Sequence, residues 1–305
     1  MPDVEIHRFA HEAMATVFGV LATGCSRETA QQAALEAFRL VDKLELELSR
    51  FAQGSDIWRI NKLTAGNWVH IGQATLDCLQ LAQHAHRQTS GAFDITIGSL
   101  IKYWRDKPVD HPVSEDEDFK KARLCTGMNL LEINAENYAA GVKIDGLLVD
   151  LGGIGKGYAV DRMLEVLNDW QIDSALAYGG NSSVYALGTL ADLPGWPLSL
   201  SLPDKAKTTS TKVFLKNQAF GASGLAVKGC HIIDPRTGTP VRHRHCCWSM
   251  APTAAYADAL STAFMIMPLK EIEKFCSSRP NISALIAWPG PDGFENRGFG
   301  KLKSI

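Results

Sequence analysis

The sequence predicts one α+β domain in which mixed and antiparallel sheets are flanked by helices. Segments with strand and helix character follow one another without strict βαβ alternation, which argues against a doubly wound parallel fold. Hydrophobic residues make up 46% of the chain and charged residues 21%, a composition typical of globular proteins. We find no internal repeat, no low-complexity tract and no composition shift that divides the chain. We therefore expect residues 1–305 to form a single domain.

The N-terminal part begins with strands and continues with helices. Residues 4–23 contain two short strand-like runs. From Arg27 to Leu48 apolar residues recur at steps of three and four, which predicts a long amphipathic helix. A turn-rich loop then leads to a short helix that opens at Ile57, and a further helix covers Leu76–Thr89.

The remaining chain alternates strands with three more helices. The polar and acidic segment 108–118 contains two prolines and is the best candidate for an exposed connection. The glycine-rich segment Gly152–Gly157 opens a helix, and two further helices are expected at Tyr256–Met267 and Leu269–Ser278. The predicted strands are Leu130–Ile133, Val142–Asp145, Ser174–Tyr178, Ser183–Leu187, Leu198–Leu202, Val213–Phe214 and Ala284–Trp288.

Charge and cysteine content exclude several functional classes. Lys and Arg number 31 against 33 Asp and Glu, so the chain lacks the basic character of a nucleic-acid-binding protein. No stretch reaches the roughly 18 consecutive apolar residues of a membrane span. The 7 cysteines include no CxxC pair and fit a reducing compartment. Charged residues before Cys25 spoil its likeness to a lipoprotein cleavage site, so we expect a cytoplasmic protein.

The segment Gly152–Gly157 has the composition of an anion-binding loop. Its glycines let the backbone approach an anion, the free N–H groups of a helix start favour one, and Lys156 adds positive charge. The spacing of both nucleotide-binding fingerprints is missing, however, and the alternative is a tight strand-to-helix turn. Asp150, just before the loop, either accepts hydrogen bonds from a ligand or caps the loop.

Asp258 and Thr262 form a candidate metal-binding pair. They lie four residues apart on a predicted helix, so their side chains share one face. A carboxylate oxygen beside a hydroxyl oxygen, on a helix of small and apolar residues, suits a hard cation such as Mg²⁺. The alternative is a solvated or capping Asp and a Thr that bonds back to its own helix.

The histidines give weaker indications of function. His231 precedes a turn at Asp234–Gly238 and can position a hydroxyl or take its proton, although a lone His is more often structural. Residues 243–247 contain two His and two Cys whose spacing matches no standard zinc site. We interpret them as an ordinary passage from a loop into a strand.

Taken in order, these segments resemble the ApbE family, the FAD:protein FMN transferases, from about Met14 to Met267. Several separated motifs in the same order are hard to obtain by chance. The stretches that carry the resemblance are GAFDITIG at 91–98, VDLGGIGKGYAVD at 149–161, GGN at 179–181, HIIDPRTG at 231–238, APTA at 251–254 and ADALST at 257–262.

The resemblance implies a T-fold-like domain, FAD as substrate and Mg²⁺ as cofactor. It assigns Mg²⁺ to Asp258 and Thr262, with Ser261 nearby and a main-chain carbonyl from Gly153. The residues that it places against FAD are Met14, Phe51, Ala92, Phe93, Asp94, Asp150, Lys156 and Ile233.

The implied reaction is Mg²⁺-dependent transfer of FMN from FAD to a Ser or Thr hydroxyl of an acceptor flavoprotein, forming a phosphoester and releasing AMP. Its candidate catalytic residues are Lys156, which would hold the phosphates, Asp258 and His231. The alternatives are a Mg²⁺-dependent FAD pyrophosphatase, a non-catalytic flavin-binding protein and a flavin oxidoreductase. The Asp258/Thr262 pair argues against the last two, because flavin redox chemistry requires no cation at the pyrophosphate.

Three positions depart from the family pattern. Gly153 stands where relatives often carry Ser, Thr or Ala, and Ala222 stands where they often carry Thr. Phe51 occupies a position often filled by Tyr, and the balance between transfer to protein and to water can depend on such contacts. Relatives are also commonly exported lipoproteins, whereas we expect a cytoplasmic enzyme. The sequence leaves open the acceptor, the oligomeric state and the number of metal ions.

Overall fold

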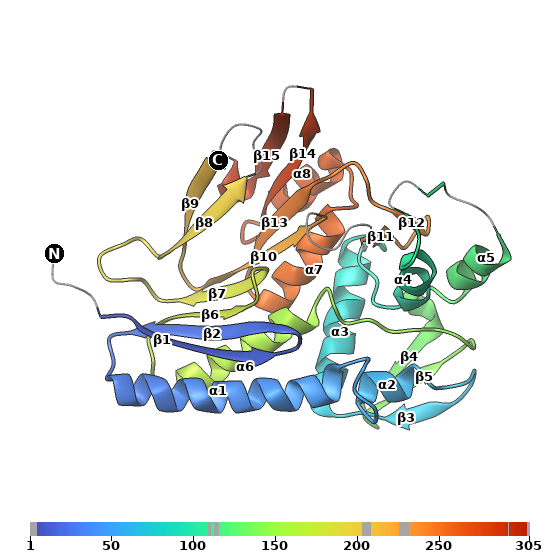
Figure 1. The fold of residues 1–305 in the computed structure, drawn as a ribbon, viewed down its shortest axis with the longest axis horizontal. Coiled ribbons are helices and arrows are strands. Elements are labelled where there is room, and N and C mark those ends of the chain that lie inside the picture. Colours follow the sequence, from blue (N-terminus) through green and yellow to red (C-terminus); the bar gives the residue numbers. More distant parts are fainter. Residues whose placement is uncertain are drawn as a thin grey trace.

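The computed structural model describes residues 5–108, 111–112, 116–202, 209–225, 232–291 and 293–303. Its largest element is an eight-stranded sheet in which every neighbouring pair of strands is antiparallel (Figure 1). The strands in spatial order are β1 (His7–Ala13), β2 (Thr16–Thr23), β6 (Ser174–Gly179), β7 (Ser183–Leu187), β10 (Gln218–Gly224), β13 (Cys246–Ala251), β14 (Ser283–Gly290) and β15 (Gly293–Phe299).

Helices cover one face of this sheet. The long helix α1 (Arg27–Leu48) packs on β1 and β2, and its N-terminus is capped by Ser26, whose hydroxyl accepts from the Thr29 amide. Helix α6 (Gly155–Asp169) lies between α1 and α7 (Ala254–Phe264), while α8 (Leu269–Ser277) packs on β14 and β15. The buried face of α1 is rich in alanine, and such short side chains let α6 approach closely.

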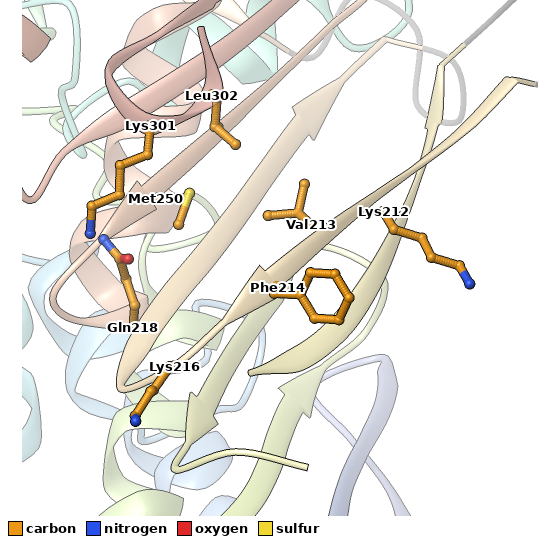
Figure 2. Close-up of a pocket in the computed structure, with 8 residues that line it drawn as sticks. All are labelled: Lys212, Val213, Phe214, Lys216, Gln218, Met250, Lys301 and Leu302. Carbon is orange, nitrogen blue, oxygen red and sulfur yellow. The ribbon is translucent and has the colours of Figure 1, made fainter. Parts of the chain in front are cut away.

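A hairpin covers part of the other face. It consists of β8 (Trp196–Leu202) and β9 (Thr209–Leu215), and its Trp196 and Leu215 pack on Phe220 and Met250 of the large sheet. Figure 2 shows a pocket of about 330 Å³ beside this hairpin. It is lined by Lys212, Val213, Phe214, Lys216, Gln218, Met250, Lys301 and Leu302, none of which is a predicted site residue.

Smaller elements gather at one end of the molecule, on the right in Figure 1. They include a three-stranded sheet, several helices and a two-stranded hairpin. The strands are β3 (Trp68–His70), β5 (Ala139–Val142) and β4 (Leu131–Asn134) of the sheet, and β11 (Ile233–Asp234) and β12 (Thr239–Pro240) of the hairpin. The helices are α2 (Asp56–Ile60), α3 (Gln73–Gln88), α4 (Gly98–Trp104), α5 (Glu117–Leu124) and the 3₁₀ turn η1 (Met128–Leu130), and a second 3₁₀ turn, η2 (Gly300–Leu302), lies near the C-terminus.

The predicted fold class is confirmed: the structure combines helices with antiparallel sheets. The prediction of a strand at Val142–Asp145 is wrong, because the strand occupies Ala139–Val142. Its small residues are required by packing, since a Cβ on Gly141 would lie 2.6 Å from the ring of Trp68. Among the described residues, no helix combines the length and apolar character of a membrane span.

The segment 108–118 is described only in part. Pro108, His111 and Pro112 are irregular, and residues 117 and 118 begin α5, which Asp116 caps by accepting from the Phe119 amide. The other residues of this segment lie outside the described ranges. Its role as a connection stays a prediction.

Candidate active site

Helix α7 carries Asp258 and Thr262, and its first turn is fixed by three acceptors. The hydroxyl of Thr253 accepts from the Tyr256 amide at 3.3 Å. The carboxylate of Asp161, on α6, accepts from the amides of Ala254 at 2.7 Å and Ala255 at 2.9 Å. These acceptors satisfy the free N–H groups of the helix start and complement its positive end. The two helices are thereby joined at the start of α7.

The backbones of α6 and α7 touch at Gly157. A Cβ at this position would overlap the carbonyl oxygen of Ala254, so only glycine fits. The Gly157 amide donates to Oδ2 of Asp258 at 2.9 Å. The glycine-rich segment opens a helix, as predicted, and it also supplies an N–H donor to the candidate metal ligand, which the sequence did not indicate.

Asp258 is buried, with 4% of its surface exposed. The hydroxyl of Ser183 lies 2.8 Å from Oδ1 and 2.7 Å from Oδ2 of its carboxylate. Burial raises the pKa of Asp258 to about 6, while the charge of Lys156 and the hydrogen bonds from Ser183 and Gly157 act in the opposite direction. Of the alternatives that the sequence left, a solvated Asp does not match this environment, whereas the bond from Gly157 is a capping contact to the first turn of α6.

Three hydroxyl groups lie next to one another at the C-terminal part of α7. Ser223 Oγ, on β10, lies 2.8 Å from Ser261 Oγ and 3.1 Å from Thr262 Oγ1. Ser261 also donates to the carbonyl of Asp258 at 2.9 Å. The predicted metal-site residues Asp258, Ser261 and Thr262 therefore share one side of α7, facing β7 and β10.

Gly153 lies against this group of hydroxyls. A Cβ built on Gly153 would be 3.3 Å from Thr262 Oγ1 and 3.1 Å from the ring of Phe93. The missing side chain leaves open the space beside Thr262, where any Cβ would be crowded in this chain. The structure thus brings together three residues predicted from separate motifs.

The oxygen donors of this site fit Mg²⁺. The carboxylate of Asp258 and the hydroxyls of Ser261 and Thr262 are hard ligands of the kind this ion takes, and the resemblance adds a main-chain carbonyl from Gly153. Within the described ranges of the chain, only Ser183 donates a hydrogen bond to Asp258 Oδ1, which leaves a lone pair of this oxygen for a cation. Among the described residues no group of three or more His, Cys, Asp and Glu forms a metal cluster, so a site here depends on hydroxyl and carbonyl oxygens.

Asp150 both caps the loop and belongs to an ion pair. Its Oδ1 accepts from the Gly152 amide at 2.7 Å, and its Oδ2 lies 2.8 Å from Arg50 Nη1. The Arg50 guanidinium is also 4.6 Å from the centre of the Phe51 ring, and Phe51 is 76% exposed. Arg50, which the sequence analysis did not select, thus joins two predicted FAD-contacting residues.

Lys156 lies near the oxygen cluster, where it could bind an anion, but its ammonium group is hydrogen-bonded to a carbonyl of its own loop. Its Nζ lies 3.4 Å from the Gly152 carbonyl oxygen, and it is exposed to solvent on that side. Because its positive charge acts on Asp258, the ammonium group lies within electrostatic range of the oxygen cluster.

The Ala92–Phe93–Asp94 turn is buried, and Asp94 holds it in shape. Asp94 Oδ1 accepts from the Thr96 amide at 2.7 Å and from its hydroxyl at 2.6 Å, while Oδ2 accepts from the Met128 amide at 3.2 Å. Burial raises the pKa of Asp94, and these bonds and His86 oppose the rise. In this structure Asp94 acts on the loop itself, and Phe93 is the member of the turn that reaches Gly153.

The remaining predicted residues lie elsewhere or outside the described ranges. Met14 forms the β1–β2 turn with a φ of 49°. Ile233 packs in an apolar cluster with Leu100, Trp104 and Phe119. His231 lies outside the described residues, so its role stays a prediction. In the segment 243–247, strand β13 begins at Cys246, and successive side chains of a strand point to opposite faces.

Besides Arg50, sequence reasoning missed two serines of the site. Ser183 and Ser223 come from strands far from α7 in the sequence, and a single serine in a strand carries no pattern. The one indication in the sequence was Ala222, next to Ser223, which the resemblance singled out only because a threonine is expected there.

The fold and the site define an α+β protein with a buried cluster of oxygen donors beside a lysine. Residues 14–286 match the model of the ApbE family, which is most of the chain, and the chain belongs to this family. It is 27% identical to the FAD:protein FMN transferase of Buchnera aphidicola, over 81% of this chain and 76% of the relative. It is equally similar, at 27%, to the FAD:protein FMN transferase of Vibrio cholerae, over 76% of this chain and 72% of the relative.

A solved structure confirms the fold. The flavin transferase ApbE from Vibrio cholerae superposes with a TM-score of 0.86 at 24% sequence identity, covering 99% of both chains. The resemblance that the motifs indicated is thereby confirmed at the level of family and fold.

Proposed function

We propose that this chain is a Mg²⁺-dependent FAD:protein FMN transferase. It moves FMN from FAD to a Ser or Thr hydroxyl of an acceptor flavoprotein, forms a phosphoester and releases AMP. The observation that carries the proposal is that Asp258, Thr262 and Gly153 lie close together, within electrostatic range of Lys156. The relatives of the chain that are named FAD:protein FMN transferase support it.

The oxygen cluster would hold the metal. Asp258 and Thr262 would bind Mg²⁺ with the Gly153 carbonyl, and Ser261 would lie next to them. Bound there, the ion would neutralise negative charge on the pyrophosphate as its bond breaks.

The chain's own residues would bind and orient FAD around this point. Lys156 would exchange the Gly152 carbonyl for a phosphate oxygen, because a full negative charge is a stronger acceptor for an ammonium group than a neutral carbonyl. Phe93 would keep water from the side of Gly153. The other residues that we propose to line the FAD site are Met14, Phe51, Ala92, Asp94, Asp150 and Ile233.

The chemical step is a substitution at phosphorus. The acceptor hydroxyl oxygen forms a bond to the FMN-side phosphorus, and the bond from that phosphorus to the bridging oxygen breaks. AMP leaves with the bridging oxygen, and the hydroxyl proton passes to a base, for which we propose His231.

The proposal is tested by incubating the protein with FAD, Mg²⁺ and a Ser- or Thr-containing acceptor domain, and measuring intact mass and AMP. We expect the acceptor to gain one FMN for each AMP released, and a Ser/Thr→Ala acceptor to gain none. AMP and free FMN without a modified acceptor would instead identify a pyrophosphatase. Bound FAD without AMP would identify a flavin-binding protein. A cytoplasmic location also stays a proposal.

A further inference from the structure

Ser183 begins β7 in the middle of the large sheet and is 2% exposed. Its partners on the adjacent strands are both glycines, Gly179 on β6 and Gly221 on β10. A Cβ on Gly221 would lie 2.5 Å from the carbonyl carbon of Ala257. Helix α7 therefore rests directly on the sheet backbone at this point, which brings the short serine side chain within reach of the helix.

The hydroxyl of Ser183 spans the carboxylate of Asp258. It lies 2.8 Å from one oxygen and 2.7 Å from the other, so its single proton is shared between them. The Gly157 amide approaches Oδ2 from α6. The carboxylate is thus held from two different elements, which restricts rotation about its side-chain torsions.

We propose that Ser183 is a positioning residue, which orients the Asp258 carboxylate for metal binding. This inference rests on the proposed function, because it takes Asp258 as a ligand of Mg²⁺. Partners that orient a metal ligand commonly change metal affinity by about 10- to 100-fold when they are removed. Ser183 has no contact with FAD or with the acceptor in this scheme, so its effect should be on the metal.

A merely structural serine offers a matched control. Ser249, on β13, is also buried, and its hydroxyl donates to the Ala257 carbonyl at 2.5 Å. It therefore joins the same helix to the same sheet, one residue before Asp258, without touching the carboxylate. Ser183→Ala and Ser249→Ala each remove one buried hydroxyl between sheet and helix.

The experiment measures metal affinity without FAD, by Mg²⁺ calorimetry and by the electron paramagnetic resonance of added Mn²⁺. We expect Ser183→Ala to weaken binding by about 10- to 100-fold and Ser183→Thr, which keeps the hydroxyl, to restore most of it. Ser249→Ala should keep the wild-type affinity even though it lowers stability. Ser183→Cys, close in volume but a weak donor, should bind more weakly than wild type and provides a second variant if Ser183→Ala does not fold.

Asp258→Ala separates the two ways in which the inference can fail. If Asp258→Ala loses metal binding while Ser183→Ala and Ser183→Cys bind as wild type, the role of Ser183 is refuted and the metal site stands. Equal weakening in Ser183→Ala and Ser249→Ala would likewise refute a specific role. If Asp258→Ala binds the metal as wild type does, the metal assignment itself is wrong.

Discussion

Met14 and Ala15, which form the two-residue turn between β1 and β2, hold a backbone conformation that is unusual for residues other than glycine. Their φ angles are 49° and 56°, in the left-handed region that non-glycine residues avoid. Such two-residue hairpins usually carry Asn-Gly or similar pairs. Because Met14 is a proposed FAD contact, the strain is concentrated where the chain meets its substrate.

Replacing Ala15 by glycine should remove part of this strain. We expect Ala15→Gly to raise the free energy of unfolding by about 0.5–1 kcal/mol, since the relief at positive φ exceeds the entropy lost by glycine. Urea unfolding measures the change. Ala10→Gly, in the exposed middle of β1, should lower stability instead, and a stabilisation of the same size there would argue against the explanation.

Asp258 carries the prediction for the chemical step. Asp258→Ala should reduce the rate of Mg²⁺-dependent AMP release from FAD by at least about 100-fold. The reason is that loss of the metal ligand removes several kcal/mol of transition-state stabilisation. Chromatography of AMP measures the rate. Asp42→Ala, which removes a surface carboxylate paired with His11 at 2.7 Å, should keep it. Undiminished release by Asp258→Ala would refute the metal assignment.

At the scale of elements, the contact between α6 and α7 depends on Asp161. Burial raises the pKa of Asp161 to about 6, opposed by the two amides that it accepts from and by Arg162, while Glu165 adds to the rise. The folded protein therefore binds this proton more tightly than the unfolded chain, whose Asp has a pKa of about 3.9. Stability from this group is largest below about pH 4 and falls as pH rises to about 6.

The variant Asp161→Asn isolates this effect. The asparagine side chain cannot ionise. The free energy of unfolding of the variant minus that of the wild type should therefore rise by about 2–3 kcal/mol between pH 4 and pH 7. The variant also places an amide where two N–H groups need acceptors, so at pH 4 it should be the less stable protein. Urea unfolding at several pH values tests the slope, and a pH-independent difference would contradict it.

How much of the fold could be predicted depended on the element. Helix α1 was predicted with its observed bounds, because apolar residues recur at steps of three and four throughout Arg27–Leu48. Strand β10 was not predicted, since Gly221 has low strand propensity and is required there by the close approach of Ala257 on α7. Strand β13 was expected only as the strand that follows the 243–247 passage, without bounds. Helix α4 was also missed, because it starts at Gly98 without a capping side chain.

The site divides in the same way. The Asp258/Thr262 pair follows from helical spacing alone, and Lys156 from its glycine-rich loop. Ser183 and Ser223 contact these residues only because strands that are distant in the sequence pair in the sheet. The order of the strands cannot be read from local sequence patterns. Arg50 reaches Asp150 across 100 residues of chain for the same reason.

At the scale of the whole molecule, the proposed FAD and metal contacts come from many elements: the β1–β2 turn, the segments after α1 and α3, the loop before α6, the first turn of α6, α7 and β11. Ligands that bind only the folded state stabilise it by about 2.7 kcal/mol at 100 times their dissociation constant. FAD with Mg²⁺ should therefore raise the melting temperature by about 4–6 °C under those conditions, measured by calorimetry. Chelation of the metal should remove most of the increase, and an equal increase without metal would contradict coupled binding.

Hydrogen exchange of the Gly157 amide, which is bonded to Asp258, can report on the stability of the site. This amide lies where two helix backbones touch, so its proton reaches solvent only when α6 and α7 separate. Deuterium uptake at this one position should then be as slow as at the most protected strands. Faster deuterium uptake at the Gly157 amide would show that Asp258 has lost its hydrogen bond, without a measurement of activity.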